Sequence, residues 1–329
     1  MTTTDGRMGS RASSVLLRQM EYLSALAREG HFARAADACH VSQPSLSAGI
    51  SKLERDLGVS IVHRGRRYEG LTKEGERVLW WAHRILAECD ALHEDLSSMA
   101  GSLSGVLRVG AIPTALPVAP LLTTPFCERH PDAGVALESL PSQEISRRLG
   151  EFDLDAAVTY VDDGEVGDVR ITPLYEERYL LLTPLHGRFA DRGTVGWAEA
   201  AELPLCMLTP DMRNRRILDG FFAEAGAAAV PAIETDTVAA LYAHVATRQW
   251  SSVVSHAWLN MFGVPEGMCL VRMTDPGRYP RVGLVVADRD PGSLLAGALL
   301  EVVRRLDVRG DLERLLQRHL ARRAGTAGA

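Results

Sequence analysis

Several features that would define other classes of protein are missing from this chain of 329 residues. No apolar run approaches the roughly 20 residues that a membrane-spanning helix requires, and residues 1–15 lack the apolar core of a signal peptide. The five cysteines form no CxxC pair, so the sequence predicts neither a disulfide framework nor a zinc site. We expect a cytoplasmic protein with reduced cysteines, no metal and a disordered leader.

Common catalytic motifs are also missing. The chain has no Gly-x-Ser-x-Gly elbow, no phosphate-binding loop and no HExxH sequence. Its ten histidines are scattered, and His244 and His256 fall on different predicted elements. We therefore expect a protein that is not an enzyme and that uses no cofactor.

The composition is that of a soluble globular protein with more than one domain. Hydrophobic residues make up 46% of the chain and charged residues 24%, and the length suggests two or three domains. The net charge of −6 argues against a protein that coats nucleic acid indiscriminately. Residues 16–75, however, carry nine Lys and Arg against seven Asp and Glu, a net of +2, so a local DNA-binding surface remains open.

Three short helices are predicted near the N-terminus. Leu16 to Arg28 has apolar residues at helical spacing, and the alanine-rich stretch Phe32 to Cys39 follows a glycine. Ser42 suits the N-cap of a third helix, whose first turn tolerates Pro44 and which ends at Gly58. Two helices joined by a tight turn place the second of them across a DNA major groove.

The third helix divides into an apolar and a polar side. Its apolar residues step by four, three and four, which predicts one buried stripe made of Leu46, Ile50, Leu53 and Leu57. Other faces present Gln43, Ser47, Ala48, Ser51 and Lys52. The Gln43 amide can pair bidentately with adenine, the two serines can reach bases or phosphates, and Lys52 can neutralise a phosphate.

A basic turn follows the third helix. Arg64-Gly65-Arg66-Arg67 lies between two short extended runs, residues 61–63 and 68–71, and this pattern predicts a wing whose arginines contact phosphates. A solvated basic turn without a role in DNA binding is the alternative.

A long helix is predicted after Thr72, which resembles an N-cap. Apolar side chains recur along it at intervals of four and three, forming a seam of Val78, Ala82, Ile85, Cys89, Leu92, Leu96 and Met99. Such a stripe on about 30 residues, roughly 45 Å of helix, is too long for the small N-terminal domain to bury. We expect a second copy of the chain to cover it; a helix packed within its own chain is the alternative.

Beyond a glycine-rich hinge at 101–105, apolar extended runs alternate with helical patterns, which is typical of an α/β sheet with parallel strands. The predicted strands are 106–112, 135–140, 156–160 and 282–287, and the predicted helices are 114–129, 143–150 and 293–306.

The N-terminal motifs together resemble the DNA-binding signature of the LysR-type regulators. They are Phe32-Ala-Arg-Ala-Ala36, Val41-Ser-Gln-Pro-Ser-Leu-Ser47, Ile50, Leu53-Glu54, Leu57-Gly58, Arg64 and Leu71-Thr-Lys-Glu-Gly75. The resemblance implies that the helix opening at Gln43 and Pro44 enters the major groove, that the wing touches the flanking minor groove, and that the next helix pairs two subunits. Ala48 stands where the family often has a long polar side chain.

The resemblance also implies a multidomain fold, with an all-α-type winged helix-turn-helix and a two-lobed α/β effector domain similar to a periplasmic binding protein. The expected divisions are a leader at 1–15, the winged helix-turn-helix at 16–72, the linker helix and hinge at 73–104, the effector domain at 105–306, and a C-terminal helix and tail at 307–329. Within the effector domain, we expect lobe one at 105–175 and 276–306, and lobe two at 176–275.

Ligands of such domains lie in the cleft against strand ends and helix starts. The family commonly offers a hydroxyl where this chain has Pro113-Thr114, at the start of a helix whose amides and dipole attract anions. The expected effector contacts are Pro113, Thr114, Ser142, Thr159, Thr209 and Pro210. For each residue alone, a cap or turn role is the plainer explanation. A small carboxylate is the favoured ligand class.

The expected function is therefore a LysR-type regulator that binds double-stranded promoter DNA as a homodimer or homotetramer and responds to a small-molecule effector, with RNA polymerase as a candidate partner and no membrane. The alternatives are an architectural DNA binder with a vestigial ligand domain and a catalytic α/β domain attached to a DNA-binding module. A peroxide-sensing member would use a close cysteine pair in the second lobe, but Cys206 and Cys269 are 63 positions apart, so redox sensing is not expected.

Overall fold

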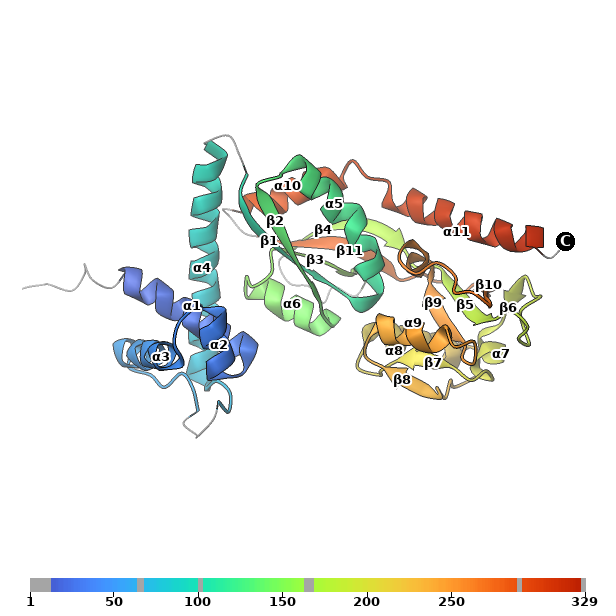
Figure 1. Cartoon of the computed structure of the whole chain (residues 1–329), viewed down its shortest axis with the longest axis horizontal. Helices are drawn as coiled ribbons and strands as arrows, with labels where there is room; N and C mark the ends of the chain where they lie inside the picture. Colours follow the sequence, from blue (N-terminus) through green and yellow to red (C-terminus); the bar gives the residue numbers. More distant parts are fainter. Residues whose placement is uncertain (1–12, 64–67, 100–102, 163–168, 289–291, 327–329) are drawn as a thin grey trace, which may run out of the picture. The chain divides into compact units, whose positions relative to one another are not determined.

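The computed structural model describes residues 13–63, 68–99, 103–162, 169–288 and 292–326 (Figure 1). The chain forms two compact units. The N-terminal unit comprises the residues up to Leu96 together with Glu151–Asp153, and the C-terminal unit comprises the remainder. Across the described ranges, no helix is long and apolar enough to span a membrane, and no cluster of three His, Cys, Asp or Glu side chains could hold a metal ion.

The N-terminal unit is built on helices. Its elements are α1 (Ser13–Glu29), α2 (Phe32–Ala38), α3 (Gln43–Leu57) and α4 (Lys73–Met99). Leu23 and Leu26 of α1 and Ala35 of α2 are fully buried in one core with Leu46 and Leu53 of α3. The small side chains at 35 and 36 allow α2 to pack closely, and the three-helix arrangement predicted from the sequence is confirmed.

Helix α3 begins and ends where its sequence predicts. The Ser42 hydroxyl accepts a hydrogen bond from the backbone N–H of Ser45 at 3.3 Å, and Gly58 closes the helix in the left-handed conformation, with φ 70°. Leu46, Ile50 and Leu53 are buried as expected, but the predicted stripe was wrong at Leu57, which is 44% exposed. Leu57 is the last residue of α3, and the chain turns away at Gly58, so no described element covers it.

The wing is described only at its base. Val62 and Leu71 pair in an antiparallel bridge, and the His63 N–H donates to the Gly70 carbonyl at 3.1 Å. The three predicted phosphate contacts, Arg64, Arg66 and Arg67, lie outside the described residues.

The C-terminal unit contains two lobes with separate sheets. The first lobe has a five-stranded sheet of order β2-β1-β3-β11-β4, and the second lobe has a four-stranded sheet of order β6-β10-β5-β9 and a two-stranded sheet, β7-β8. The bounds of the first-lobe elements are β1 (Gly105–Ala111), η1 (Pro113–Val118), α5 (Ala119–Arg129), β2 (Ala133–Ser139), α6 (Ser142–Gly150), β3 (Ala156–Tyr160), β4 (Val169–Glu176), β11 (Arg281–Ala287) and α10 (Leu294–Val303). Helices α5 and α10 cover one face of this sheet and α6 lies at the other (Figure 1).

The second lobe is inserted between β4 and β11. Its elements are β5 (Tyr179–Pro184), β6 (Thr194–Val195), α7 (Trp197–Ala201), β7 (Cys206–Leu208), α8 (Arg213–Glu224), β8 (Ile233–Thr235), α9 (Val238–Val245), β9 (Ser252–Ser255), η2 (His256–Asn260) and β10 (Met268–Met273). The chain thus crosses between the lobes twice, after β4 and before β11. The final helix, α11 (Val308–Thr326), contributes Leu312 to the first-lobe core and Leu316 to a second-lobe core.

The parallel arrangement predicted for the strands at 106–112, 135–140 and 156–160 is confirmed in β1, β2 and β3. The strand predicted at 282–287 is also present, and it runs antiparallel to both β3 and β4, so the sheet is mixed. A continuous apolar run such as residues 282–287 predicts burial but carries no information about strand direction. The helix predicted at 114–129 begins as the short 3-10 helix η1 and becomes α-helical only at Ala119, because Pro117 and Pro120 lack the N–H groups that an α-helix would use.

Candidate DNA-binding face and ligand cleft

The polar side of α3 is open to solvent. Gln43, Pro44, Ser47 and Ser51 are exposed and Lys52 is half-buried, so the residues predicted to contact DNA share the outer side of one helix. Gly49 lies on the inner side, where an added Cβ would come within 2.6 Å of Cδ2 of Tyr22 on α1. Glycine therefore lets α3 lie directly against α1, which fixes the direction in which the polar side faces. Sequence reasoning had given Gly49 no role.

The base of the wing is tied to α3 by Glu54. Its Oε1 accepts hydrogen bonds from the backbone N–H groups of Ile61 at 2.7 Å and Val62 at 3.3 Å. Thr72 donates to the Ser60 carbonyl at 2.6 Å and caps α4 by accepting from the Gly75 N–H at 2.9 Å. The base of the wing is therefore held to α3 and to the start of α4.

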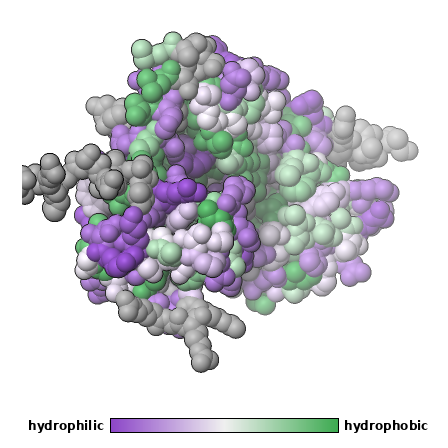
Figure 2. Space-filling view, turned by 60° about the vertical axis from the view of Figure 1, so that its left-hand side comes forward, coloured by the Kyte–Doolittle hydropathy of each residue, from purple (hydrophilic) through white to green (hydrophobic). Residues whose placement is uncertain are grey.

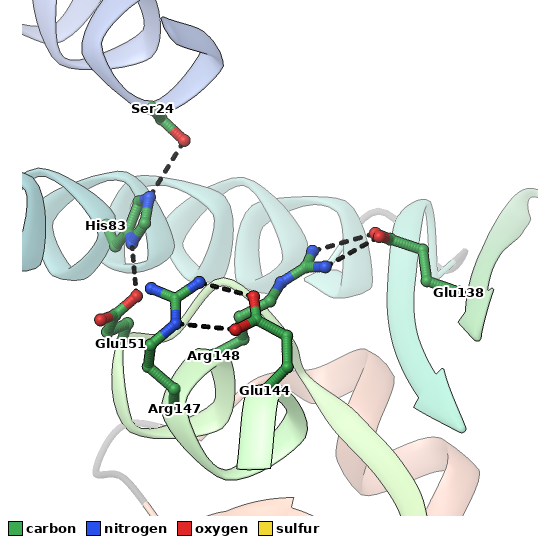
Figure 3. A network of polar contacts seen from close by, with 7 residues as sticks. All are labelled: Ser24, His83, Glu138, Glu144, Arg147, Arg148 and Glu151. Carbon is green, nitrogen blue, oxygen red and sulfur yellow. Dashed lines mark hydrogen bonds and ion pairs between the residues drawn. The ribbon is translucent and has the colours of Figure 1, made fainter. Parts of the chain in front are cut away.

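The apolar seam of α4 is covered only in part. Its N-terminal half packs within the chain, where Ala82 is buried and the Ser24 hydroxyl of α1 lies 3.1 Å from Nε2 of His83 (Figure 3). The other half remains open, because Leu92, Leu96 and Met99 are 58%, 56% and 80% exposed. These three apolar side chains of α4 therefore form a surface that the other described residues leave uncovered. On the face of the molecule shown in Figure 2, apolar residues gather in separate patches among hydrophilic ones.

A small cavity of about 30 Å³ lies between the two lobes at Thr114. Thr114, Asn214, Ser252 and Ser255 supply its polar lining, and the other lining residues are Pro117, Met207, Leu208, Leu218, Val238, Leu241, Val253, Val254 and Trp258. None of the described residues in this lining has a charged side chain. In addition, Thr114 lies inside a short 3-10 helix and not at an α-helix start. Both facts weaken the case for a carboxylate at this point.

The other predicted effector contacts do not join Thr114 in this lining. Thr159 is buried in β3, and Pro113 is half-buried beside Thr114. The hydroxyls of Ser142 and Thr209 are buried without a hydrogen-bond partner in the described part of the chain, and Pro210 is exposed. Helix α6, which begins at Ser142, is held to β2 by a pair of hydrogen bonds from Arg148 to Glu138, at 2.8 and 2.9 Å (Figure 3).

A buried network that sequence reasoning missed connects the Thr114 cavity to the crossing between β4 and β5. Thr114 Oγ1 lies 3.5 Å from the Tyr160 hydroxyl, which donates to Oε2 of Glu177 at 3.0 Å. Asn214 Nδ2 donates to the same tyrosine hydroxyl at 3.2 Å, and Tyr179 donates to Glu177 Oε2 at 2.6 Å. Residues of both lobes therefore meet at one carboxyl group.

Glu177 is fully buried, and its titration is shifted accordingly. Burial raises the pKa of its carboxyl from 4.5 to about 7, against the opposing effect of the hydrogen bonds from Tyr179 and Tyr160. Burial and the nearby Glu177 charge also raise the pKa values of Tyr160 and Tyr179. The network therefore contains one group that can change charge near neutral pH.

None of the five cysteines forms a disulfide. Cys206 in β7 and Cys269 in β10 are buried in different core clusters, and burial raises the pKa of the Cys206 thiol to about 11. The thiolate is the reactive form of cysteine, so burial and the raised pKa lower the reactivity of Cys206 at neutral pH.

A helical unit that presents one polar helix side, followed by a two-lobed α/β unit with a cavity between its lobes, defines a ligand-responsive DNA-binding protein. The chain belongs to the LysR family of transcriptional regulators. The family model for the bacterial regulatory helix-turn-helix protein, lysR family, matches residues 17–76, and that for the LysR substrate binding domain matches residues 100–307. The expected family, fold class and regulator function are confirmed.

Its relatives include regulators named for hydrogen peroxide. A probable hydrogen peroxide-inducible genes activator of Streptomyces viridosporus is 31% identical over 309 residues, which cover 92% of this chain and 99% of that protein. The DNA-binding transcriptional dual regulator OxyR of Escherichia coli (strain K12) is 34% identical over 64% of this chain and 69% of its own length.

Full-length solved structures share the fold. An OxyR variant from Pseudomonas aeruginosa matches with a TM-score of 0.65 and 25% identity, covering 89% of this chain and 98% of that one. The regulator CbnR, solved with its target DNA, matches with a TM-score of 0.63 and 22% identity, covering 88% and 99%.

Proposed function

We propose that this regulator reads promoter DNA through the polar side of α3, with Gln43, Pro44, Ser47, Ser51 and Lys52 at the contact and the wing arginines on adjacent phosphates. The observation that carries the proposal is the orientation of α3, whose apolar residues anchor it in the core while its polar residues face solvent. Regulation of transcription would place the protein in the cytoplasm, with RNA polymerase as a partner.

We further propose that two copies pair along α4, as a dimer or as a tetramer of two such pairs. The exposed Leu92, Leu96 and Met99 support this, because an uncovered apolar stripe on one helix suits the same stripe on a second copy. Val78 and Ala82 are covered within the chain, so they would contribute less to the contact between two copies than the seam pattern alone suggested.

Leu96→Glu is expected to dissociate the pair of copies, so that the molecular mass in solution falls. The reason is that a carboxylate in the apolar seam would lose its hydration when two copies pair. Sedimentation equilibrium would measure the mass. Leu185→Glu, which changes an exposed leucine of the C-terminal unit, is the matched control and should leave the mass unaltered. An unchanged mass for the Leu96 variant would rule out pairing along α4.

The cavity at Thr114 is proposed as a binding site, not a catalytic one, whose occupation changes the affinity for DNA. A ligand can act in this way only if it binds one arrangement of the protein more tightly than another. The Tyr160 network supports the proposal, because it joins Thr114 of the first lobe to Asn214 of the second. The cavity itself accommodates only a small group, so a larger effector would require the lobes to separate.

Thr114→Val is expected to abolish the ligand response and to preserve basal DNA binding, because valine keeps the shape of threonine but loses its hydroxyl. A thermal-shift screen of small metabolites would identify the ligand, and DNA affinity with and without it would measure the response. Thr123→Val removes a hydroxyl that donates to a carbonyl within α5 and serves as the control. A full response in the Thr114 variant would remove this residue from the site.

Peroxide response is the second candidate, since several relatives are named for it. Buried Cys206, with its raised pKa, gives little support to oxidation of a thiol in the second lobe. We therefore favour a ligand held without a covalent bond.

A further inference from the structure

A second and larger pocket, of about 540 Å³, lies beside the Tyr160 network. Tyr160 and Asp162 line it from the first lobe, and Arg213, Arg216 and Phe221 line it from α8. Arg278 and Tyr279, in the crossing from β10 to β11, complete the wall. Its volume falls within the range of pockets that hold small organic ligands. No residue expected from the sequence to contact the effector lines this pocket.

The lining carries an excess of positive charge. Among the described residues that line it, three are arginines and one is an acid, and Asp162 accepts hydrogen bonds from Nε and the backbone N–H of Arg281, each at 2.6 Å. Arg278 contacts Glu224 at 2.6 Å, while Arg216 forms no ion pair with any residue in the described ranges. In a chain whose net charge is −6, this local excess favours an anionic ligand.

Two of the arginines lie against aromatic rings. The Arg213 guanidinium carbon lies 5.2 Å from the centre of the Tyr160 ring, and that of Arg278 lies 5.5 Å from the centre of the Phe221 ring. Such stacking restricts the guanidinium, and a guanidinium is the side-chain group that can bind a carboxylate or phosphate with two parallel hydrogen bonds. The half-buried side chains of Ile217, Tyr279 and Pro280 also line the pocket and suit the carbon skeleton of an organic anion.

We propose that this pocket, which we call the arginine pocket, binds a small organic anion with two negative charges, either a dicarboxylate or a phosphate monoester. The inference rests on the proposed function in one respect, because the anion would act as an effector. The sequence led us to expect a carboxylate at Thr114, whereas this proposal places the anion at the arginines. Tyr160 belongs both to this pocket and to the hydrogen bonds with Thr114 and Glu177, so an anion here is coupled to the cavity between the lobes.

Calorimetric titration of the full chain at fixed ionic strength tests the proposal, with phthalate and glycerol phosphate as probes and benzamide as an uncharged comparison. At least one dianion should bind and benzamide should not, and the probe that binds distinguishes the two ligand sources. Arg216→Ala and Arg213→Ala should each weaken that binding by about 10- to 150-fold, the range for a hydrogen bond to a charged group. Arg188→Ala removes an exposed arginine that pairs with Glu202 elsewhere in the second lobe, and should leave binding unchanged.

Thr114→Val separates this inference from the proposed effector cavity. Dianion binding that persists in the Thr114 variant and is lost in the Arg216 variant supports the arginine pocket. Binding lost in the Thr114 variant but kept in both arginine variants would place the anion in the Thr114 cavity and overturn the inference. Failure of every dianion to bind at millimolar concentration would also overturn it. Because the titration contains no DNA, neither negative result affects the proposal for α3.

Discussion

Gln43→Ala is expected to weaken binding to a specific operator by about 1 to 3 kcal/mol, roughly 5- to 150-fold, and to leave binding to random-sequence DNA nearly unchanged. The reason is geometric. Gln43 is the first residue of α3 and is exposed, so its amide is placed to pair with a base edge when the helix enters the major groove. An alanine there removes base recognition but no phosphate contact.

The measurement is a pair of fluorescence-anisotropy titrations at one salt concentration, with the duplex that the protein selects from a random pool and with an unselected duplex. Gln143→Ala makes the same substitution at an exposed helical position of the C-terminal unit and is the matched control. Equal losses on both duplexes would show that Gln43 contributes to affinity without reading sequence.

Glu177→Gln is expected to stabilise the C-terminal unit at pH 8. The free energy of unfolding of the variant, minus that of the unchanged protein, should be about 3 kcal/mol larger at pH 8 than at pH 4.5. In the folded state, the pKa of the Glu177 carboxyl is about 7, whereas its ordinary value is 4.5. Below 4.5 the carboxyl is neutral in both states. As the pH rises toward 7, the unfolded chain releases its proton first, so the free energy of unfolding falls, and above 7 the loss is complete. Glutamine carries no charge at any pH and avoids this loss.

Calorimetric melting across pH 4.5 to 8 would reveal the difference, which corresponds to roughly 6 to 12 °C for a unit of this size. The neutral amide oxygen of Gln can still accept from Tyr160 and Tyr179, so the network is preserved. Glu202→Gln, at an exposed ion pair with Arg188, controls for the loss of one negative charge. If the Glu177 variant and the unchanged protein melt with the same pH dependence, the pKa of the Glu177 carboxyl is the same in the folded and unfolded states, and the account of its burial is wrong.

The N-terminal unit could be predicted from sequence because its determinants are local. Ser42 and Gly58 mark the ends of α3 by capping chemistry that involves only neighbouring residues, and the spacing of Leu46, Ile50 and Leu53 defines its buried side. Leu57 follows the same spacing but is exposed, because burial at a helix end depends on whether another element reaches it.

In the C-terminal unit, the missing information was tertiary. The apolar run at 282–287 predicted a strand but not that it would return antiparallel to β3. The resemblance placed Thr114 in the cleft, but the described lining of the cavity there carries no charge. The arginines of the other pocket come together only when α8 lies beside the end of β3 and the crossing to β11. Glu177 lies among charged neighbours in the sequence, Glu176 and Arg178, and nothing local distinguishes the fully buried carboxyl of Glu177 from the half-buried one of Glu176.

The central claim is that the polar side of α3 lies in the major groove, and dimethyl sulfate footprinting tests it most directly. This reagent methylates N7 of guanine, which faces the major groove, and N3 of adenine, which faces the minor groove. We predict protection of guanine N7 at the centre of each half-site, and the Gln43→Ala protein should need a higher concentration to give the same protection because its affinity for the site is lower. Unprotected guanine N7 throughout a site that the protein demonstrably occupies would contradict the account.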